Sequence, residues 1–203
     1  MLKNISLLLS AVFSPLIIPT YGIILALWSS VLNNMPFDVK MSVVMMVAAM
    51  TFLLPVIVLW LMQRVGYISG FALVYREERF VPFVIAILSY MACWFYLYRA
   101  GAPSWLTMFV VGAIVAALIA CIVTRWWKIS IHTTSLAGML AMICNMAING
   151  HAQCDMLPLI TVAALLLGAV GTARLVLNRH TLAQCAAGVL NGFLCVYIAM
   201  SLG

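Results

Sequence analysis

Apolar runs of about 20 residues follow one another along almost the whole chain, and each is long enough to cross the roughly 30 Å hydrocarbon core of a bilayer as a helix. Of the 203 residues, 67% are hydrophobic and only 7% are charged, which is too little polar surface to cover a water-soluble protein of this size. Backbone inside a bilayer must satisfy its own hydrogen bonds, and these runs are long rather than alternating short strands. The sequence therefore predicts an all-α, polytopic integral membrane protein, a bundle of about six to seven transmembrane helices in one domain over residues 1–203.

Hydropathy divides the chain into seven predicted spans. They cover residues 5–31, 41–63, 81–98, 104–124, 134–149, 156–177 and 182–202. Pro15 and Pro19 interrupt the first span and Pro55 the second, so we expect kinks or a partly re-entrant first segment there. Lys3 precedes an apolar run with no small-residue cleavage site, which we interpret as a retained span and not a signal peptide. The apolar stretch 65–75 is too short to cross and carries two glycines, which predicts an interfacial segment.

The cations lie at the ends of the predicted spans, as is typical of membrane proteins, and do not indicate nucleic-acid binding. Counting crossings places eight of the ten Lys and Arg on one face of the membrane, against Lys40 and Arg99 opposite. The eight are Lys3, Arg64, Arg76, Arg79, Arg125, Lys128, Arg174 and Arg179. The positive-inside rule favours the cytoplasm for this face. Four of its eight cations are candidate ligand-binding residues, and without them the count is four cations on this face against two on the other. We expect an integral, multi-pass protein of a bacterial inner membrane, and the sequence leaves its oligomeric state open.

The six cysteines lie mostly inside apolar runs and form no CxxC pair, which is typical of small core residues rather than of disulfides or metal ligands. His151 and Cys154 form a single His-x-x-Cys in a short connection, with no second pair to complete a tetrahedral shell. We therefore expect neither a metal site nor a cofactor.

Three connections on the cation-rich face each end where a helix is predicted to begin. Arg76 and Arg79 precede one predicted helix, Lys128, Ser130 and His132 stand at the start of the next, and Arg174 and His180 lie ahead of the last. Helix N-termini and arginine side chains both favour anions. A single loop arginine is usually an interfacial anchor, and a single histidine at a helix end is usually a cap. Their coincidence, together with an arginine near the end of a span, predicts a site for an anionic headgroup.

These residues resemble a known family. Arg79 in REERFVP, Ser130 and His132 in KISIHTTS, and Arg174 with His180 in ARLVLNRHTLAQ are similar to the three-part signature of the type-2 phosphatidic acid phosphatase superfamily. The motifs span about residues 76–184, within a phosphatase-like core of about 76–203, and the third motif matches the family spacing to the residue.

The resemblance implies a membrane-embedded, metal-independent hydrolase that cleaves a lipid or polyprenyl phosphate or diphosphate through a phosphohistidine. It implies that His180 is the nucleophile and His132 the general acid and then base. Arg79, Ser130 and Arg174 would hold the phosphoryl oxygens, and Arg76 or Lys128 would replace the lysine that the family pattern has where this chain has Ala72.

Gln184 stands where the family has an aspartate. Its amide oxygen can still accept the ring N–H of His180 and fix the tautomer, but it brings no charge. Glu77 or Glu78 could supply that charge only if their loop folds over the site. The alternative is therefore a catalytically impaired, phosphatase-like protein that binds anionic lipids or helps to move them. A channel or transporter is the third hypothesis, disfavoured because no predicted span carries a buried acidic residue.

Overall fold

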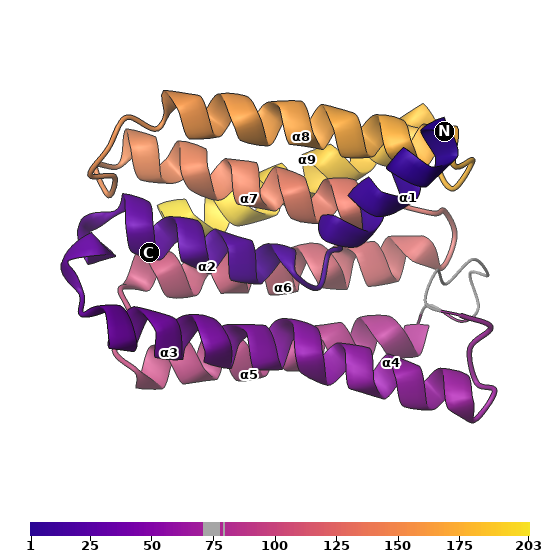
Figure 1. Ribbon diagram of the computed structural model, residues 1–203, viewed down its shortest axis with the longest axis horizontal. Helices are drawn as coiled ribbons and strands as arrows, with labels where there is room; N and C mark the ends of the chain where they lie inside the picture. The colour runs from indigo at the N-terminus through magenta and orange to yellow at the C-terminus, as the bar shows by residue number, and fades with distance from the viewer. Residues whose placement is uncertain (71–77, 79) are drawn as a thin grey trace.

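The computed structural model describes residues 1–70, 78 and 80–203, and in this part of the chain the protein is all-α. The long helices run roughly parallel to one axis, and from residue 80 onward each helix runs opposite to the one before it (Figure 1). In chain order they are α1 (Leu2–Val12), α2 (Ile18–Ser29), the 3₁₀ turn η1 (Val31–Asn34), α3 (Phe37–Ala48), the π-helical turn η2 (Ala49–Leu53), α4 (Leu54–Arg64), α5 (Phe80–Arg99), α6 (Ser104–Thr124), α7 (Ile131–Ile148), α8 (Leu157–Val176) and α9 (Leu182–Ser201).

Among the described residues, six helices are long and apolar enough to cross a membrane. They are α5 to α9 and the continuous helix Phe37–Arg64, which is made of α3, η2 and α4. The prediction of an all-α, multi-pass membrane protein is therefore confirmed.

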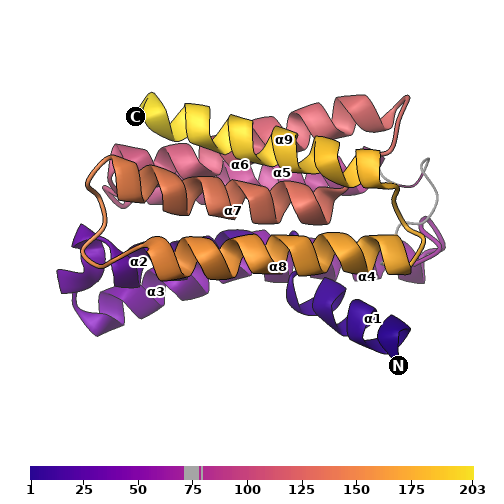
Figure 2. The ribbon, with the colours of Figure 1, turned by 90° about the horizontal axis from the view of Figure 1, so that it is seen from above.

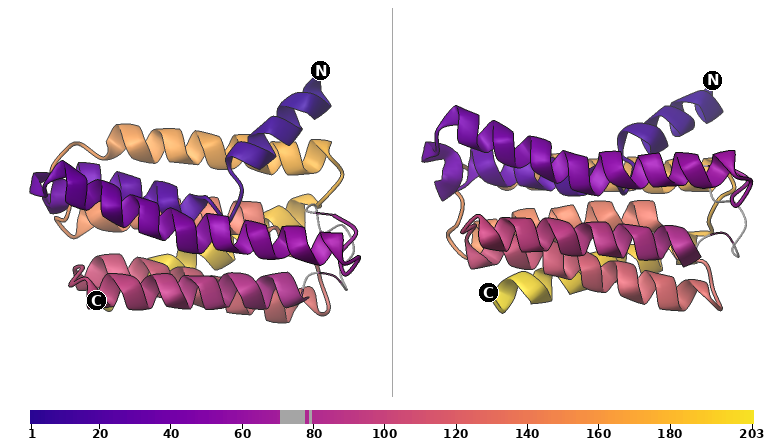
Figure 3. Two further views of the ribbon diagram at one scale, coloured as in Figure 1. Left: turned by 60° about the horizontal axis from the view of Figure 1, so that its bottom comes forward. Right: turned by 90° about the horizontal axis from the view of Figure 1, so that it is seen from below.

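The first predicted span, residues 5–31, is wrong as a single helix. It forms two shorter apolar helices, α1 and α2, and Pro15 lies in the break between them. Proline has no backbone N–H and its ring clashes with the preceding turn, so the helix ends before it. Pro19 lies in the first turn of α2, where a missing N–H costs nothing. Figures 2 and 3 show α1 leaning away from the other helices.

The second predicted span is interrupted without being broken. Pro55 lies at the start of α4, directly after the π-helical turn η2. The wider π turn makes room where the proline ring would otherwise press on the carbonyl of the preceding turn. The helix thus continues from Phe37 to Arg64.

The predicted interfacial segment, residues 65–75, is described only up to residue 70. In this part the chain turns at Gly66, whose φ of +75° suits glycine. The Glu78 carboxylate accepts hydrogen bonds from the Ser69 amide, at 3.0 Å, and from the Ser69 hydroxyl, at 2.9 Å. Glu78 therefore contacts this connection.

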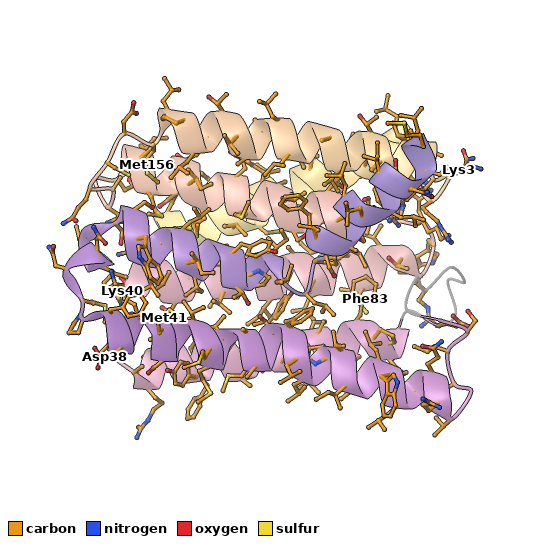
Figure 4. The ribbon with its side chains drawn as sticks, viewed as in Figure 1. Lys3, Asp38, Lys40, Met41, Phe83 and Met156 are labelled. Atoms are coloured by element: carbon orange, nitrogen blue, oxygen red, sulfur yellow. The ribbon has the colours of Figure 1, made fainter. Side chains whose placement is uncertain are left out.

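The connections gather at two opposite ends of the bundle, as the crossing count predicted. One end carries the N-terminus and the connections 125–130 and 177–181; we call it the histidine end. The other carries the connections 100–103 and 149–156 and the C-terminus (Figure 1). Figure 4 shows Lys3 at the histidine end and Asp38 and Lys40 at the opposite one.

The His151 connection, at the end opposite the histidine end, makes structural contacts. The His151 ring stacks on Trp105 with centroids 5.0 Å apart. Asp155 Oδ1 accepts from the Leu157 amide at 2.9 Å and so caps the start of α8. Cys154 contacts the Ser29 carbonyl. These contacts join the connection to α2, α6 and α8.

Helices α7 and α9 pack closely because two glycines on α9 present no side chain to α7. A methyl group on Gly188 would overlap the Thr133 hydroxyl and the Ser130 carbonyl, and one on Gly192 would overlap the Thr134 carbonyl. Small residues let membrane helices approach this closely. The contact aligns the start of α7, with His132, beside the first turns of α9.

We predict that Gly192→Ala destabilises the bundle, because a backbone carbonyl cannot move aside as a flexible side chain can. Gly168→Ala on α8 is the matched control, since a methyl group there meets nothing within 4 Å. Alanine is the better helix former by about 1 kcal/mol, so the control should be neutral or more stable. Thermal unfolding in detergent measures both, and equal behaviour of the two variants would contradict the packing described here.

Candidate functional site

One cavity extends into the bundle from the histidine end, with a volume of about 200 Å³. His132 from α7, Arg174 from α8 and His180 from the connection before α9 all line it. The remainder of its wall is mostly apolar and comes mainly from α2, α5, α6 and α7. Three residues predicted from sequence as site residues therefore share one cavity.

The cavity is deep as well as apolar. Its lining on α6 runs from Ala120 to Phe109, which is about 16 Å along the helix at about 1.5 Å per residue. Tyr90 and Phe83 of α5 line it at intermediate depths. Figure 4 shows Phe83 between the α4–α5 pair and the other helices, nearer the histidine end. A polar end thus continues into an apolar interior that is at least as deep as one leaflet, about 15 Å.

The tautomer of His180 follows from its contacts. Gln184 Oε1 lies 3.2 Å from His180 Nδ1 and 3.2 Å from the Thr181 amide nitrogen. The Thr181 amide can only donate, so the Gln184 atom that faces both groups must be the oxygen. That oxygen can only accept, so Nδ1 of His180 carries a proton. In the neutral ring Nε2 is then the basic nitrogen.

Gln184 also starts helix α9. The Thr181 hydroxyl accepts from the Gln184 amide at 3.3 Å while the Gln184 side chain accepts from the Thr181 amide, a capping box. His180 is buried, with 9% of its surface exposed. The helix cap therefore fixes the histidine ring, and the expectation that Gln184 orients His180 is met by this geometry.

His132 lies in the first turn of α7, directly after the N-cap residue Ser130 and Ile131. Its Nε2 lies 3.1 Å from the carbonyl oxygen of Ser10, near the end of α1. A carbonyl only accepts, so Nε2 of His132 carries a proton and donates it. The two site histidines therefore present different nitrogens: His132 an N–H at Nε2, His180 an N–H at Nδ1.

Arg174 is half-buried in the last turn of α8. Its Nη1 donates to the Ser10 hydroxyl at 3.3 Å. A guanidinium stays charged at any ordinary pH, and burying it near a membrane interior is costly unless it has acceptors. Arg174 therefore supplies fixed positive charge at the polar end of the cavity.

Two further predicted phosphate ligands do not line the cavity. The Ser130 side chain is fully buried, and its backbone amide donates to the Gln184 carbonyl at 3.2 Å. Ser130 thus joins the start of α7 to α9. Lys128 lies in the connection 125–130, outside the cavity lining.

Arg76, Arg79, Ala72 and Glu77 lie outside the described residues, so their predicted roles stay predictions. Glu78, which was considered as a replacement for the missing carboxylate, accepts its hydrogen bonds from Ser69. No group of three or more metal-ligating side chains occurs within residues 1–70, 78 and 80–203.

Sequence reasoning did not find Ser10. The available signal was the pair Ser6 and Ser10, which stand four residues apart in a mostly apolar helix. Both are buried although most of α1 is exposed. Tyr90, which donates to the Pro15 carbonyl at 3.0 Å, was also missed because an aromatic residue in a span carries no distinctive signal.

Comparison of the chain with protein-family models, curated proteins and solved structures gave no match. The fold is that of a helical, multi-pass integral membrane protein, with six helices of spanning length among its described residues.

We predict that Gln184→Leu changes the tautomer of His180, because it removes the acceptor of the Nδ1 proton. The ¹⁵N chemical shifts of histidine-labelled protein should show Nδ1–H in the wild type and a mixture of tautomers in the variant. Gln153→Leu, exposed at the opposite end, is the control and should leave the His180 signals unchanged. Unaltered signals in Gln184→Leu would contradict the assignment.

Proposed function

We propose that this protein is a membrane-embedded phosphatase that hydrolyses a lipid or polyprenyl phosphate or diphosphate through a phosphohistidine, with no requirement for a metal ion. The observation that carries the proposal is the position of His180, which lines the cavity with its Nδ1 3.2 Å from Gln184 Oε1, a contact that favours the proton on Nδ1. A histidine whose Nε2 carries no proton is a competent nucleophile toward phosphorus.

The chemistry requires two proton-handling groups and a positive clamp. His180 Nε2 attacks phosphorus and forms an N–P bond while the bond from phosphorus to the leaving oxygen breaks. His132 gives its Nε2 proton to that oxygen, and then takes a proton from the water that attacks the phosphohistidine. The second step returns His180 and releases inorganic phosphate, so that both histidines end in their starting forms.

Arg174 supports this mechanism because phosphoryl transfer depends largely on neutralising the equatorial oxygens. A guanidinium can hold two oxygens of a phosphoryl group at once. The N-terminal turns of α7 and α9 add partial positive charge at the same end. Arg76, Arg79 and Lys128 are further proposed ligands, whereas the buried position of Ser130 favours a structural role for it.

The form of the cavity supports a lipid as the proposed substrate. A soluble phosphate ester would need only the polar end, but the lining continues for about 16 Å along α6 and is mostly apolar. Alanines of α6, among them Ala113, Ala116 and Ala117, form part of this wall and leave room beside them. Phosphatidate, phosphatidylglycerophosphate and a polyprenyl diphosphate are the candidate substrates.

We predict that purified protein in lipid nanodiscs releases inorganic phosphate from at least one of these three lipids in the presence of EDTA. His180→Ala should lower the rate by on the order of 10³-fold or more, because it removes the nucleophile. His151→Ala is the matched control, since that ring stacks on Trp105 at the opposite end. Phosphate release that persists in His180→Ala would exclude the phosphohistidine.

The second candidate function is binding or movement of anionic lipids without hydrolysis. The observation that favours it is Gln184, which orients His180 but carries no negative charge to stabilise a cationic phosphohistidine. In this function the cavity and Arg174 would still hold a lipid, and His132 and His180 would serve as hydrogen-bonding groups only.

We predict that Gln184→Asp hydrolyses the lipid at least as fast as the wild type, because a carboxylate would add charge stabilisation to the orientation that glutamine provides. Rates for the two proteins on the three-lipid panel measure this. A large loss of rate would mean that glutamine has a role of its own. Activity that appears only in the variant would assign the wild type to the binding class.

A further inference from the structure

Helix α1 has its polar and apolar faces arranged for a membrane. Its two serines, Ser6 and Ser10, face inward with 6% and 8% of their surface exposed, whereas Leu7 and Leu8 are 54% and 65% exposed. A helix with this polarity presents hydrocarbon to lipid and hydroxyl groups to the protein interior. At 11 residues it is about 17 Å long, so it is too short to span a bilayer alone.

Ser10 makes contact with two of the residues proposed to act on phosphate. Its carbonyl accepts from His132 Nε2 at 3.1 Å, and its hydroxyl accepts from Arg174 Nη1 at 3.3 Å. In the proposed mechanism, His132 donates to the leaving oxygen and Arg174 to the phosphoryl oxygens. In this structure both donate to oxygens of Ser10 instead. Ser10 and a phosphate group compete for the same donors.

The end of α1 depends on these partners. The last four carbonyls of a helix have no backbone N–H donor within the helix, so they need donors from elsewhere. Leu9 and Ala11 accept from Phe13 and Ser14 of the following turn, and Val12 accepts from the Tyr21 hydroxyl at 3.3 Å. The Ser10 carbonyl accepts from His132. The negative end of the α1 dipole thus points at the positive end of the cavity.

The chain on either side of the break is held differently. The start of the second segment is fixed to α5 because Tyr90 donates to the Pro15 carbonyl at 3.0 Å. Helix α1, by contrast, packs mainly on α8 among the described helices, and Figure 2 shows its N-terminal part diverging from the bundle. A pivot at residues 13–14 would move α1 while α2 keeps its place.

We propose that α1 is a gate between the lipid and the polar end of the cavity, latched by Ser10. An anionic headgroup opens it by taking the hydrogen bonds of His132 and Arg174, and the helix then leaves an opening toward the hydrocarbon through which a lipid chain can reach the cavity. The ligand class rests on the proposed function. The latch itself rests on the two contacts of Ser10.

Only molecules with the latch open can bind the anion. The apparent affinity therefore equals the affinity of the open form multiplied by the fraction of molecules that are open. Removing the Ser10 hydroxyl deletes one of the two latch contacts, and a hydrogen bond to a charged group contributes enough to shift the open fraction by about tenfold. The pentavalent vanadate ion is a suitable probe, because it resembles the phosphoryl group in charge and shape and requires no turnover.

We predict that Ser10→Ala binds vanadate about tenfold more tightly than the wild type. Ser6→Ala is the matched control, because Ser6 lies one turn away on the same buried face of α1, and its affinity should equal that of the wild type. Titration calorimetry of the full chain in nanodiscs measures the three affinities.

Hydrogen exchange provides the second readout. It needs only the wild type, so it tests whether α1 opens on anion binding even if Ser10→Ala does not fold. Saturating vanadate should speed exchange of the amides of residues 6–14 and leave α2 unchanged. Vanadate binding with unchanged or slower α1 exchange, or with no gain of affinity in a folded Ser10→Ala, overturns the gate alone. Absence of vanadate binding in both proteins overturns the proposed anion site and the gate together.

Discussion

The close approach of α7 and α9 is the contact on which the candidate site depends. Gly188 and Gly192 present bare backbone to Ser130, Thr133 and Thr134, and no larger residue fits there. In lipid, such packing replaces the hydrophobic effect as the source of helix association. The same contact sets the distance between the helix starts that carry His132 and His180. Stability and site geometry therefore have one physical origin.

Each charged or polar donor inside a membrane protein needs an acceptor. Arg174 is held near the end of α8, where its Nη1 reaches the Ser10 hydroxyl, and His132 donates to the carbonyl of that residue. In both cases an oxygen of the chain itself accepts from the donor. A ligand that takes these two donors must therefore replace hydrogen bonds that Ser10 already accepts. That exchange favours a multiply charged oxyanion over water or a neutral headgroup.

Much of the fold could be predicted because apolar runs of membrane length are the strongest signal that a sequence carries. The break at Pro15 followed from the chemistry of proline, although the sequence alone did not decide between a kink and two helices. The orientation of His180 by Gln184 followed from helical spacing, since residues four apart lie on one face. The assignment of the chain to a family and to a reaction stays a prediction.

Other features could not be predicted, for physical reasons. The contacts of Ser10 join α1 to α7 and α8, and such tertiary contacts leave no periodicity in a sequence. Ser130 was expected to touch phosphate because the family resemblance implies that role, but an N-cap residue can also be covered by another helix. Here its amide donates to the Gln184 carbonyl of α9. Spacing fixes which residues are near one another along a helix, and packing decides which way they face.

The capping box at the start of α9 has a consequence for the chemistry of the ring beside it. One oxygen, Gln184 Oε1, accepts both the Thr181 amide that begins the helix and the Nδ1 proton of His180. The tautomer of the ring is thereby tied to the folding of a single helical turn. While that turn is formed, Nε2 is the basic nitrogen; when it frays, Gln184 no longer holds the Nδ1 proton and this tautomer is no longer imposed. Local order at one helix end thus sets the reactivity of a histidine, with no change elsewhere in the bundle.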